Sequence, residues 1–422
     1  MILRKILPLL MSVLLITIML SGCDMVAYYI DSGRMTVPTT TPTDPPVKPI
    51  PLDAPFAQGW CFTRLNDDLQ HDYAAVYEAV ETALEAEDSS VLVDGVSYTG
   101  VRVELPVSLL GRDDVHLLYR AVTTDNPQFF FLSNRYSYEG YTRDEVDYYT
   151  AISLTFNMKR AQRIAAKAAL DNAVEEIFSQ LPPGSGDYDT ELYCHDALLE
   201  RCTYQDAITS DADPATNYPQ AFTAYGALVE GIAGCEGYSR AMQLLLLRRG
   251  NACTLVTGTA QSEGHAPQGH MWNLVRIEGR GYHLDATWND DDELPRHAYF
   301  NLTTEEIERT HQIDDRGANI GIDTCTSTGA NFYHREGLYL DTYDPNDIAA
   351  VFAHGIMQGW AIIDVRFPAE KFGRAQSLVT DPKRLASYIN PLLPKGTSFW
   401  ARYITYADDV HGTITLRQSA AK

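Results

Sequence analysis

Three short segments carry the side chains that could do chemistry. Cys235 follows a glycine-containing turn and opens a helical pattern, so the partial positive charge of a helix N-terminus would stabilise its thiolate, the nucleophilic form. His270 begins one strand-like run and Asp285 lies within the next. If these two strands pair as a hairpin, the carboxylate would fix the tautomer of the imidazole and favour its charged form. The three residues therefore predict nucleophilic catalysis by a thiol.

The elements that must position these residues predict an α+β fold. Residues 239–249 form a strongly helical pattern, and strand-like runs follow at 252–258, 271–277 and 281–287. A helix followed by antiparallel-looking strands favours a helix packed on an antiparallel sheet over alternating βαβ units. We expect the helix that begins at Cys235 to lie against this sheet.

A smaller α+β region is predicted ahead of these segments, over residues 59–185. The expected elements there are helices over 69–84 and 158–181, strands over 129–132 and 148–156, and a hairpin over 91–104. Residues 316–422 are predicted to form a further α+β region, for which the sequence offers no chemistry. The expected elements there are strands at 338–340, 360–367, 399–406 and 411–416, with helices near 347–352 and 382–389.

The order Cys235, then His270-Met-Trp-Asn, then Asp285-Ala-Thr-Trp resembles the bacterial transglutaminase-like superfamily, which shares a papain-like core. The resemblance covers residues 186–315, the predicted catalytic domain. It implies that Cys235 attacks a carboxamide or peptide carbonyl, that His270 shares its proton and passes it to the leaving amine, and that Asp285 orients His270. A thioester would form, and either an amine or water would resolve it.

The same resemblance raises the question of which groups complete the site. The oxyanion needs hydrogen-bond donors, and the backbone N–H of Cys235 is one candidate, with Tyr225 or Gln220 as side-chain candidates. Trp272 and Trp288 are expected to be core residues or walls of a cleft that contacts substrate.

Other residues near the motifs were weighed against them. His265 is a rival to His270 in the same loop, but only His270 precedes Trp-Asn. His283 would share a strand face with Asp285 and is expected to serve packing. Arg240 departs from the family pattern, because relatives more often carry a small or uncharged residue there. The five residues of 289–293 are all acidic or polar, but they lack the spacing and the glycine of a calcium loop and are expected to be solvated.

The N-terminus predicts export. A positive start and an apolar run over residues 6–20 precede Leu-Ser-Gly-Cys23, which resembles the bacterial lipobox. The resemblance implies a signal peptide over 1–22 and a diacylglycerol thioether on Cys23. Residues 23–58 are predicted to form a tether, because seven prolines fall within 35–55 and proline removes a backbone donor. The folded part would then be extracytoplasmic and anchored to the bacterial membrane by lipid.

The composition is that of a folded protein, with 45% hydrophobic and 21% charged residues. The formal net charge of −23 argues against a nucleic-acid partner, which would need clustered Lys and Arg. Seven cysteines without a CxxC pair argue against a structural zinc cluster. We expect no cofactor and no metal, although Cys235, His270 and Asp285 could instead ligate zinc.

We expect a peptide or protein substrate, with cell-wall peptide as one candidate. The pattern leaves an alternative open, in which the fold is retained as a catalytically silent surface lipoprotein that binds peptide or cell wall. The complete set of three residues favours the enzyme, because a binding protein has no need of all three.

Overall fold

The computed structural model divides the chain into two compact units, one of residues 1–278 with 311–323 and one of 279–310 with 324–422. Each unit is described by itself below. The described residues are 30–36, 50–51, 54–262, 264–290, 297–314, 317, 319–399 and 403–418. The predicted signal peptide and Cys23 lie outside them, and so do residues 291–293 of the acidic run.

The first unit begins with a five-stranded sheet in the order β1-β4-β5-β3-β2. Its strands are β1 (Ile30–Thr36), β2 (Ser90–Val93), β3 (Val96–Leu110), β4 (Leu132–Arg143) and β5 (Val146–Phe156). The hairpin predicted over 91–104 is confirmed, and its turn residues Asp94 and Gly95 have φ values of 51° and 76°. Strand β1 pairs in parallel with β4, although it falls within the segment predicted to be a tether. That stretch contains no proline, so its backbone N–H groups remain available for pairing.

Two helices accompany this sheet, α2 (Asp67–Ala83) and α3 (Arg112–Asp125). Helix α2 confirms the helix predicted over 69–84. Asn66 caps it by accepting a hydrogen bond from Leu69 N, and its apolar stripe packs on β3. The strand predicted over 129–132 is wrong. Residues 126–131 form consecutive turns and β4 begins only at Leu132, because the Asn126-Pro127 turn sets the direction of the chain there.

The second half of this unit carries the segments with chemistry. Helix α4 (Arg160–Ser179) confirms the helix predicted over 158–181, and α5 (Asp187–Arg201) follows it. Several short elements then lead to the central helix α7 (Cys235–Arg248). They are β6 (Thr203–Tyr204), η3 (Asp206–Thr209), α6 (Pro214–Asn217), η4 (Pro219–Phe222), η5 (Gly226–Glu230) and β7 (Ile232–Ala233).

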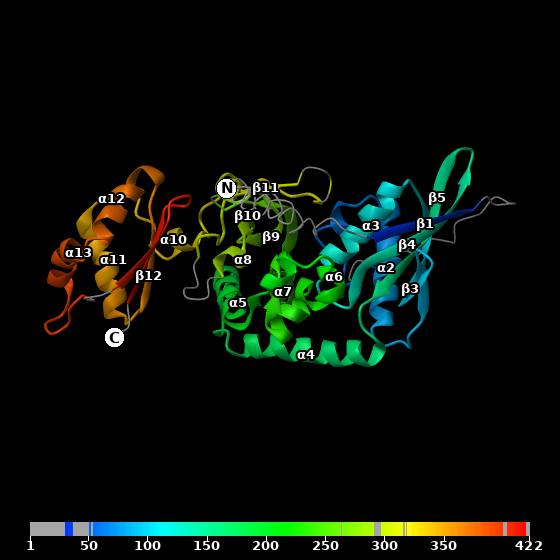
Figure 1. Ribbon diagram of the computed structural model, residues 1–422, viewed down its shortest axis with the longest axis horizontal. Coiled ribbons are helices and arrows are strands. Elements are labelled where there is room, and N and C mark those ends of the chain that lie inside the picture. The colour runs from blue at the N-terminus through cyan, green and yellow to red at the C-terminus, as the bar shows by residue number, and fades with distance from the viewer. Residues whose placement is uncertain are drawn as a thin grey trace, which may run out of the picture. The chain divides into compact units, whose positions relative to one another are not determined.

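Helix α7 packs on an antiparallel sheet, as predicted. Strands β8 (Cys253–Ala260) and β9 (Gln268–Ile277) pair along their lengths, and β11 (His311–Ile313) pairs with the other edge of β8. Helix α7 contacts β8 and β9 on one side and α5 on the other (Figure 1). This part of the unit is therefore α+β, and the first residue of α7 packs against strands β8 and β9.

The second unit holds the remaining elements. They are β10 (Arg280–Leu284), α8 (Ala286–Asn289), α9 (Thr304–Ile307), α10 (Phe332–Arg335), α11 (Pro345–Met357), β12 (Ile362–Arg366), α12 (Ala369–Val379), α13 (Pro382–Ile389), η6 (Asn390–Leu392), β13 (Tyr403–Asp408) and β14 (Thr413–Gln418). An antiparallel sheet in the order β12-β14-β13 shares one apolar core with α11, α12 and α13. The helices and three of the strands predicted here are confirmed, but residues 338–340 contribute only an isolated bridge from Tyr339 to Arg366.

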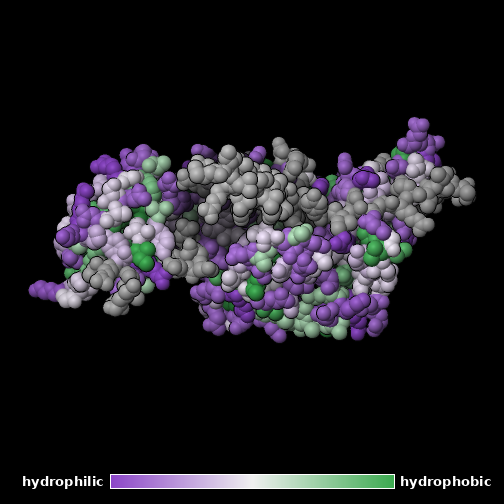
Figure 2. All heavy atoms as spheres, viewed as in Figure 1, coloured by the Kyte–Doolittle hydropathy of each residue, from purple (hydrophilic) through white to green (hydrophobic). Residues whose placement is uncertain are grey.

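Figure 2 shows hydrophilic residues over most of the described part of the visible face. Among the described residues, no helix combines the length and the apolar character that a membrane crossing requires.

Candidate active site

Cys235 is the first residue of α7, as the sequence predicts. The residue before it, Gly234, has extended backbone angles, so the chain enters the helix at the thiol itself. Only 7% of Cys235 is exposed, and its side chain packs with Leu255 and Met271. The first N–H groups of a helix have no acceptor inside it, so this position supplies donors and positive potential to a thiolate.

The other cysteines of the described residues differ from Cys235 in their setting. All six described cysteines are buried, and no two of them form a disulfide with each other. Cys253 lies within β8 with 2% exposure, as predicted for a core residue, and burial together with the nearby Glu191 raises the pKa of its thiol well above 9.0. Cys235 is the one of the six that begins a helix of more than one turn. Its position is thus the one expected of the predicted nucleophile.

The 3-10 helix η4 packs against the first turn of α7. Gly234 N donates to Ala221 O at 2.9 Å. A Cβ atom at Gly237 would lie only 2.5 Å from the same carbonyl oxygen, so glycine is needed for this close approach. The contact places Gln220, the residue before Ala221, near the start of the helix.

Gln220 and Tyr225, the two predicted oxyanion candidates, have different surroundings. Oε1 of Gln220 is buried and has no hydrogen-bond partner among the described residues. The Tyr225 ring instead stacks on Phe130, with 5.5 Å between ring centroids, and burial followed by repulsion from Glu230 raises the pKa of its hydroxyl. The two ends of an amide exchange by rotation, so the unpartnered Oε1 position of Gln220 could hold an N–H donor, which favours Gln220 over Tyr225 as the oxyanion candidate.

His270 lies near the start of β9, opposite Gly258 of β8, and is 6% exposed. Its ring stacks with Trp272, with 6.1 Å between centroids, and Trp272 is fully buried. Trp272 is therefore a core residue that supports the imidazole. This outcome is one of the two that the sequence left open for it.

A second histidine lies beside His270. The ring centroid of His311, in β11, is 5.3 Å from that of His270 and 4.9 Å from that of Trp272. The sequence did not predict His311 as a site residue, because it lies after the third motif and belongs to no motif of its own. Gly258 allows β11 to come this close, since a Cβ atom there would lie 2.0 Å from Gln312 O and 2.9 Å from Cη2 of Trp272.

Two buried side chains fasten α7 to β9. Ser239 Oγ donates to Met271 O at 3.0 Å, and Asn273 Nδ2 donates to Ser239 O at 3.0 Å and to Thr254 O at 3.4 Å. Asn273 is the Asn of the His-Met-Trp-Asn motif, so one end of that motif holds the helix that bears the thiol. Side chains alternate along a strand, so His270 shares a face with Trp272 and the face of Met271 and Asn273 meets α7. The predicted pair of Cys235 and His270 therefore requires the thiol and the imidazole to meet at the end of β9, and this pairing stays a prediction.

Asp285 belongs to the second unit and is fully buried there. Its Oδ1 accepts hydrogen bonds from Thr287 N at 2.9 Å and Trp288 N at 3.1 Å, so it caps α8. Bonds from two backbone N–H groups favour the ionised carboxylate. The predicted pairing of Asp285 with His270 joins the two units and stays a prediction.

Two further predicted residues lie in the same unit. Trp288 packs edge-to-face on Tyr299, with 5.2 Å between centroids. His283 is fully buried, and its Nε2 lies 3.1 Å from Thr304 Oγ1, which is the packing role expected for it.

Arg240, the departure from the family pattern, reaches from α7 to the N-terminal part of its unit. Its Nε lies 2.8 Å from Glu236 Oε1, and its Nη1 donates to Thr123 O at the end of α3 at 2.7 Å. Gln243 repeats the link one turn later by donating to Thr124 O. His265 is exposed in the loop between β8 and β9, and its Nδ1 lies 3.2 Å from Ser262 Oγ.

Comparison with known proteins gives one match in sequence. A sequence model of the transglutaminase-like superfamily matches residues 179–286, a range that contains Cys235, His270 and Asp285. No curated protein sequence matches the chain.

Solved structures also match. They include a TGase, at 15% identity and TM-score 0.25 over 36% of this chain and 50% of that one. A proposed cysteine protease from Cytophaga hutchinsonii matches at 14% identity and TM-score 0.23, over 34% of this chain and 52% of that one. A proposed protease from Parabacteroides distasonis matches at 10% identity and TM-score 0.22, over 35% and 30%. The match thus spans about half of the first two chains and less of the third.

The order of the three motifs, the position of Cys235 at the start of a helix packed on an antiparallel sheet, and the matching sequence model agree with one another. Residues 179–286 of this chain belong to the transglutaminase-like superfamily.

Proposed function

We propose that the protein is a thiol enzyme that transfers or hydrolyses the acyl group of a peptide or protein amide. The observation that carries the proposal is the position of Cys235: it is the first residue of α7, in a helix that Ser239 and Asn273 fasten to the strand bearing His270. A helix mouth favours the thiolate, and the two fastenings hold the distance between the elements that bear the sulfur and the imidazole.

In the proposed reaction, His270 takes the proton of the Cys235 thiol and the thiolate attacks the amide carbonyl carbon. The carbon–nitrogen bond breaks, the leaving amine takes the proton from His270, and a thioester remains on Cys235. A second amine or a water molecule then attacks the thioester, gives its proton to His270, and releases the thiol. Asp285 is proposed to hold the imidazole in the tautomer that this sequence needs.

The oxyanion that forms on the carbonyl requires donors. We assign them to the backbone N–H of Cys235 and to the side-chain amide of Gln220. The N–H belongs to the first turn of α7, and the Gln220 carboxamide has an oxygen without a partner among the described residues. The O and N ends of an amide are interchangeable by rotation, so either end can be turned toward the site.

The first test is site-resolved alkylation with iodoacetamide at neutral pH, followed by mass spectrometry. We expect Cys235 to react faster than the five other described cysteines, and His270→Ala to lower its rate. Gln220→Ala should leave alkylation close to wild type, because iodoacetamide forms no oxyanion. Equal rates at Cys235 with and without His270 would contradict the proposed pair.

A peptide library incubated with and without an added primary amine separates the two outcomes of the reaction. Transfer would give an amine adduct, hydrolysis of a side-chain amide would give loss of ammonia, and hydrolysis of the main chain would give a cleaved peptide. Cys235→Ser should abolish all three products. A library left unchanged by a protein whose Cys235 alkylates rapidly would favour the silent binding protein instead.

The place of action is a separate part of the proposal. We propose that the chain is exported and anchored by acyl chains on Cys23, on the strength of the Leu-Ser-Gly-Cys sequence. Each buried CH₂ group of such chains contributes about 0.8 kcal/mol to membrane binding. Cys23→Ser should move the protein from the membrane fraction to the soluble fraction and remove a labelled fatty acid. A protein that keeps its membrane association without Cys23 would contradict the lipid anchor.

A further inference from the structure

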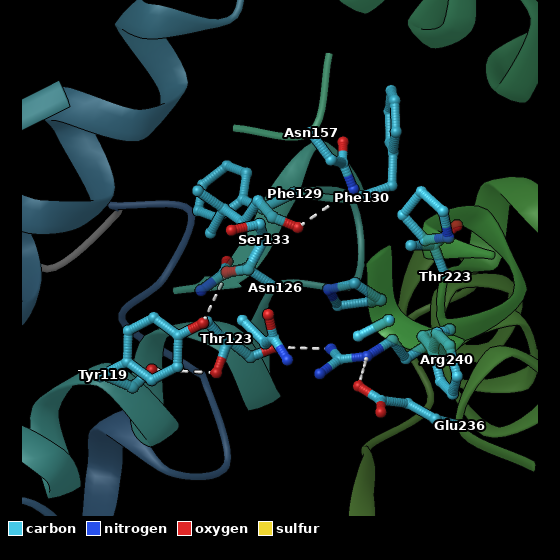
Figure 3. Close-up of a pocket in the computed structure, with 16 residues that line it drawn as sticks. Tyr119, Thr123, Asn126, Phe129, Phe130, Ser133, Asn157, Thr223, Glu236 and Arg240 are labelled. Atoms are coloured by element: carbon cyan, nitrogen blue, oxygen red, sulfur yellow. Dashed lines mark hydrogen bonds and ion pairs between the residues drawn. The ribbon is translucent and has the colours of Figure 1, made fainter. Parts of the chain in front are cut away.

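A pocket lies between the N-terminal part of the first unit and the helix that bears Cys235. Its volume is about 100 Å³. Its walls come from α3, from the turns before β4, from η4 and from the start of α7 (Figure 3). A cavity of ~150 Å³ can hold benzene. This pocket therefore has room for one side chain and not for a peptide segment.

Two residues that line the pocket are adjacent in the chain to two residues of the proposed site. Glu236 lines it and directly follows Cys235, while Pro219 lines it and directly precedes Gln220. A substrate whose carbonyl lies at Cys235 would thus have the pocket within reach of a nearby side chain. The pocket is formed by the elements that hold the nucleophile and the proposed oxyanion donor.

The charges of the pocket are already matched. Glu236 and Arg240 are 2.8 Å apart, and their side chains are only 21% and 14% exposed. Figure 3 shows Arg240 crossing from α7 to the carbonyl of Thr123. A ligand carboxylate would compete with Glu236, and a ligand cation would compete with Arg240, so either would leave one partly buried charge without its partner. The pair favours an uncharged ligand.

The remaining walls combine aromatic rings with one amide side chain whose oxygen has no hydrogen-bond partner among the described residues. Tyr119, Phe130 and Phe222 line the pocket. Asn157 also lines it, and its Nδ2 donates to Leu132 O over 3.4 Å while its Oδ1 is buried without a partner among the described residues. A half-turn about the terminal torsion of the Asn157 side chain exchanges its N and O ends, so the amide can offer a ligand either a donor or an acceptor.

We propose that this pocket is a specificity subsite that accepts an uncharged side chain ending in a carboxamide or hydroxyl. The inference rests on the proposed thiol chemistry, because it takes Cys235 as the point at which the substrate reacts. It also gives Arg240 a role, which is to close one side of the pocket where a smaller residue would leave it open.

Four peptidyl vinyl sulfones that differ in one side chain test the subsite. The thiolate of Cys235 adds to the vinyl carbon and the adjacent carbon takes a proton, so each probe labels the nucleophile without a leaving group. The varied side chain would be Gln, Glu, Lys or norleucine, placed in turn at the two residues nearest the sulfone. We expect the Gln probe to label Cys235 about tenfold faster than the Glu and Lys probes, and about fivefold faster than norleucine.

Two variants change the ranking in opposite ways. Asn157→Leu should bring the Gln and norleucine rates to within about twofold, because the amide partner is gone. Arg240→Met leaves Glu236 unpaired, so the Lys probe should gain about tenfold while the Glu probe does not. Asn346→Leu, the same kind of change at an exposed residue of the second unit, is the control and should keep the wild-type order. Melting curves establish that each variant is folded.

Iodoacetamide separates the two possible failures, because it has no side chain for the pocket. Slow alkylation of Cys235 would overturn the proposed nucleophile and the subsite with it. Rapid alkylation by iodoacetamide together with equal rates for the four probes, or with the Glu or Lys probe fastest, would overturn the subsite alone. An unchanged ranking in Asn157→Leu would do the same.

Discussion

Asn273 and Gln243 are two buried amide side chains that hold α7 in place by hydrogen bonds, the first near Cys235 and the second further along the helix. Both side chains are fully buried. The amide nitrogen of each one donates to two backbone carbonyls. Both amide oxygens lack a partner among the described residues. They differ in their distance along α7 from Cys235. Asn273 donates to the carbonyl of Ser239, about one turn after Cys235. Gln243 lies about two turns after Cys235 and donates to Thr124 O at the end of α3 and to Cys253 O of β8.

The cost in stability should be similar for Asn273→Ala and Gln243→Ala. Each change removes two neutral hydrogen bonds, of 3.0 and 3.4 Å for Asn273 and of 2.8 and 3.3 Å for Gln243. At about 0.5–1.5 kcal/mol each, the loss in free energy of unfolding is about 1–3 kcal/mol for either variant. Urea denaturation measures it, and the slope with denaturant should stay at the wild-type value.

The effect on the thiol should differ between the two variants. Asn273→Ala removes one of the two fastenings between α7 and the strand of His270 and leaves only that of Ser239, so we expect alkylation of Cys235 by iodoacetamide to slow by about tenfold, which is about 1.4 kcal/mol. Gln243→Ala should keep the rate within about twofold, because Gln243 lies about two turns along α7 from Cys235. If the two variants lose stability equally and also lose reactivity equally, then Asn273 does not position the site.

Three further predictions follow from other contacts. Gly258→Ala should lower the melting temperature by several degrees and slow alkylation of Cys235, because its Cβ would overlap Gln312 O. Gly373→Ala is the control, because a Cβ atom there would lie in open space. Equal melting temperatures for the two variants would contradict the argument. Burial would raise the pKa of Glu306, but attraction to Arg366 and hydrogen bonds from Thr303 outweigh it and lower the pKa below 4.5. The lowered pKa means that this contribution to stability is present above the unfolded pKa and is lost as pH falls through the folded one, so acid titration should destabilise the wild type more steeply than Glu306→Gln. Asp285→Asn should keep the cap of α8 in part but slow the amide reaction by at least about a hundredfold, as measured by product formation at saturating peptide.

Local patterns in the sequence were enough to predict most elements and the chemical groups. The spacing of apolar residues predicted α2, α4 and α7, because a 3.6-residue period is visible without knowing what packs against it. The thiol, imidazole and carboxylate were likewise recognisable, since each stands in a short motif. The Phe129–Leu132 stretch was mispredicted as strand, because four apolar residues in a row look alike in a strand and in a buried turn.

Only the tertiary structure decided which residues surround the nucleophile. His311 lies beside His270 because β11 pairs with the far edge of β8, and a pairing between segments distant in the sequence leaves no local period to detect. The difference between Gln220 and Tyr225 has the same origin, because a ring that stacks on Phe130 and an amide left without a partner are properties of packing. The sequence determined which chemical groups this protein carries, since their types and local elements are written in short stretches of chain. The fold determined their neighbours, since contacts between distant segments depend on how the whole chain closes on itself.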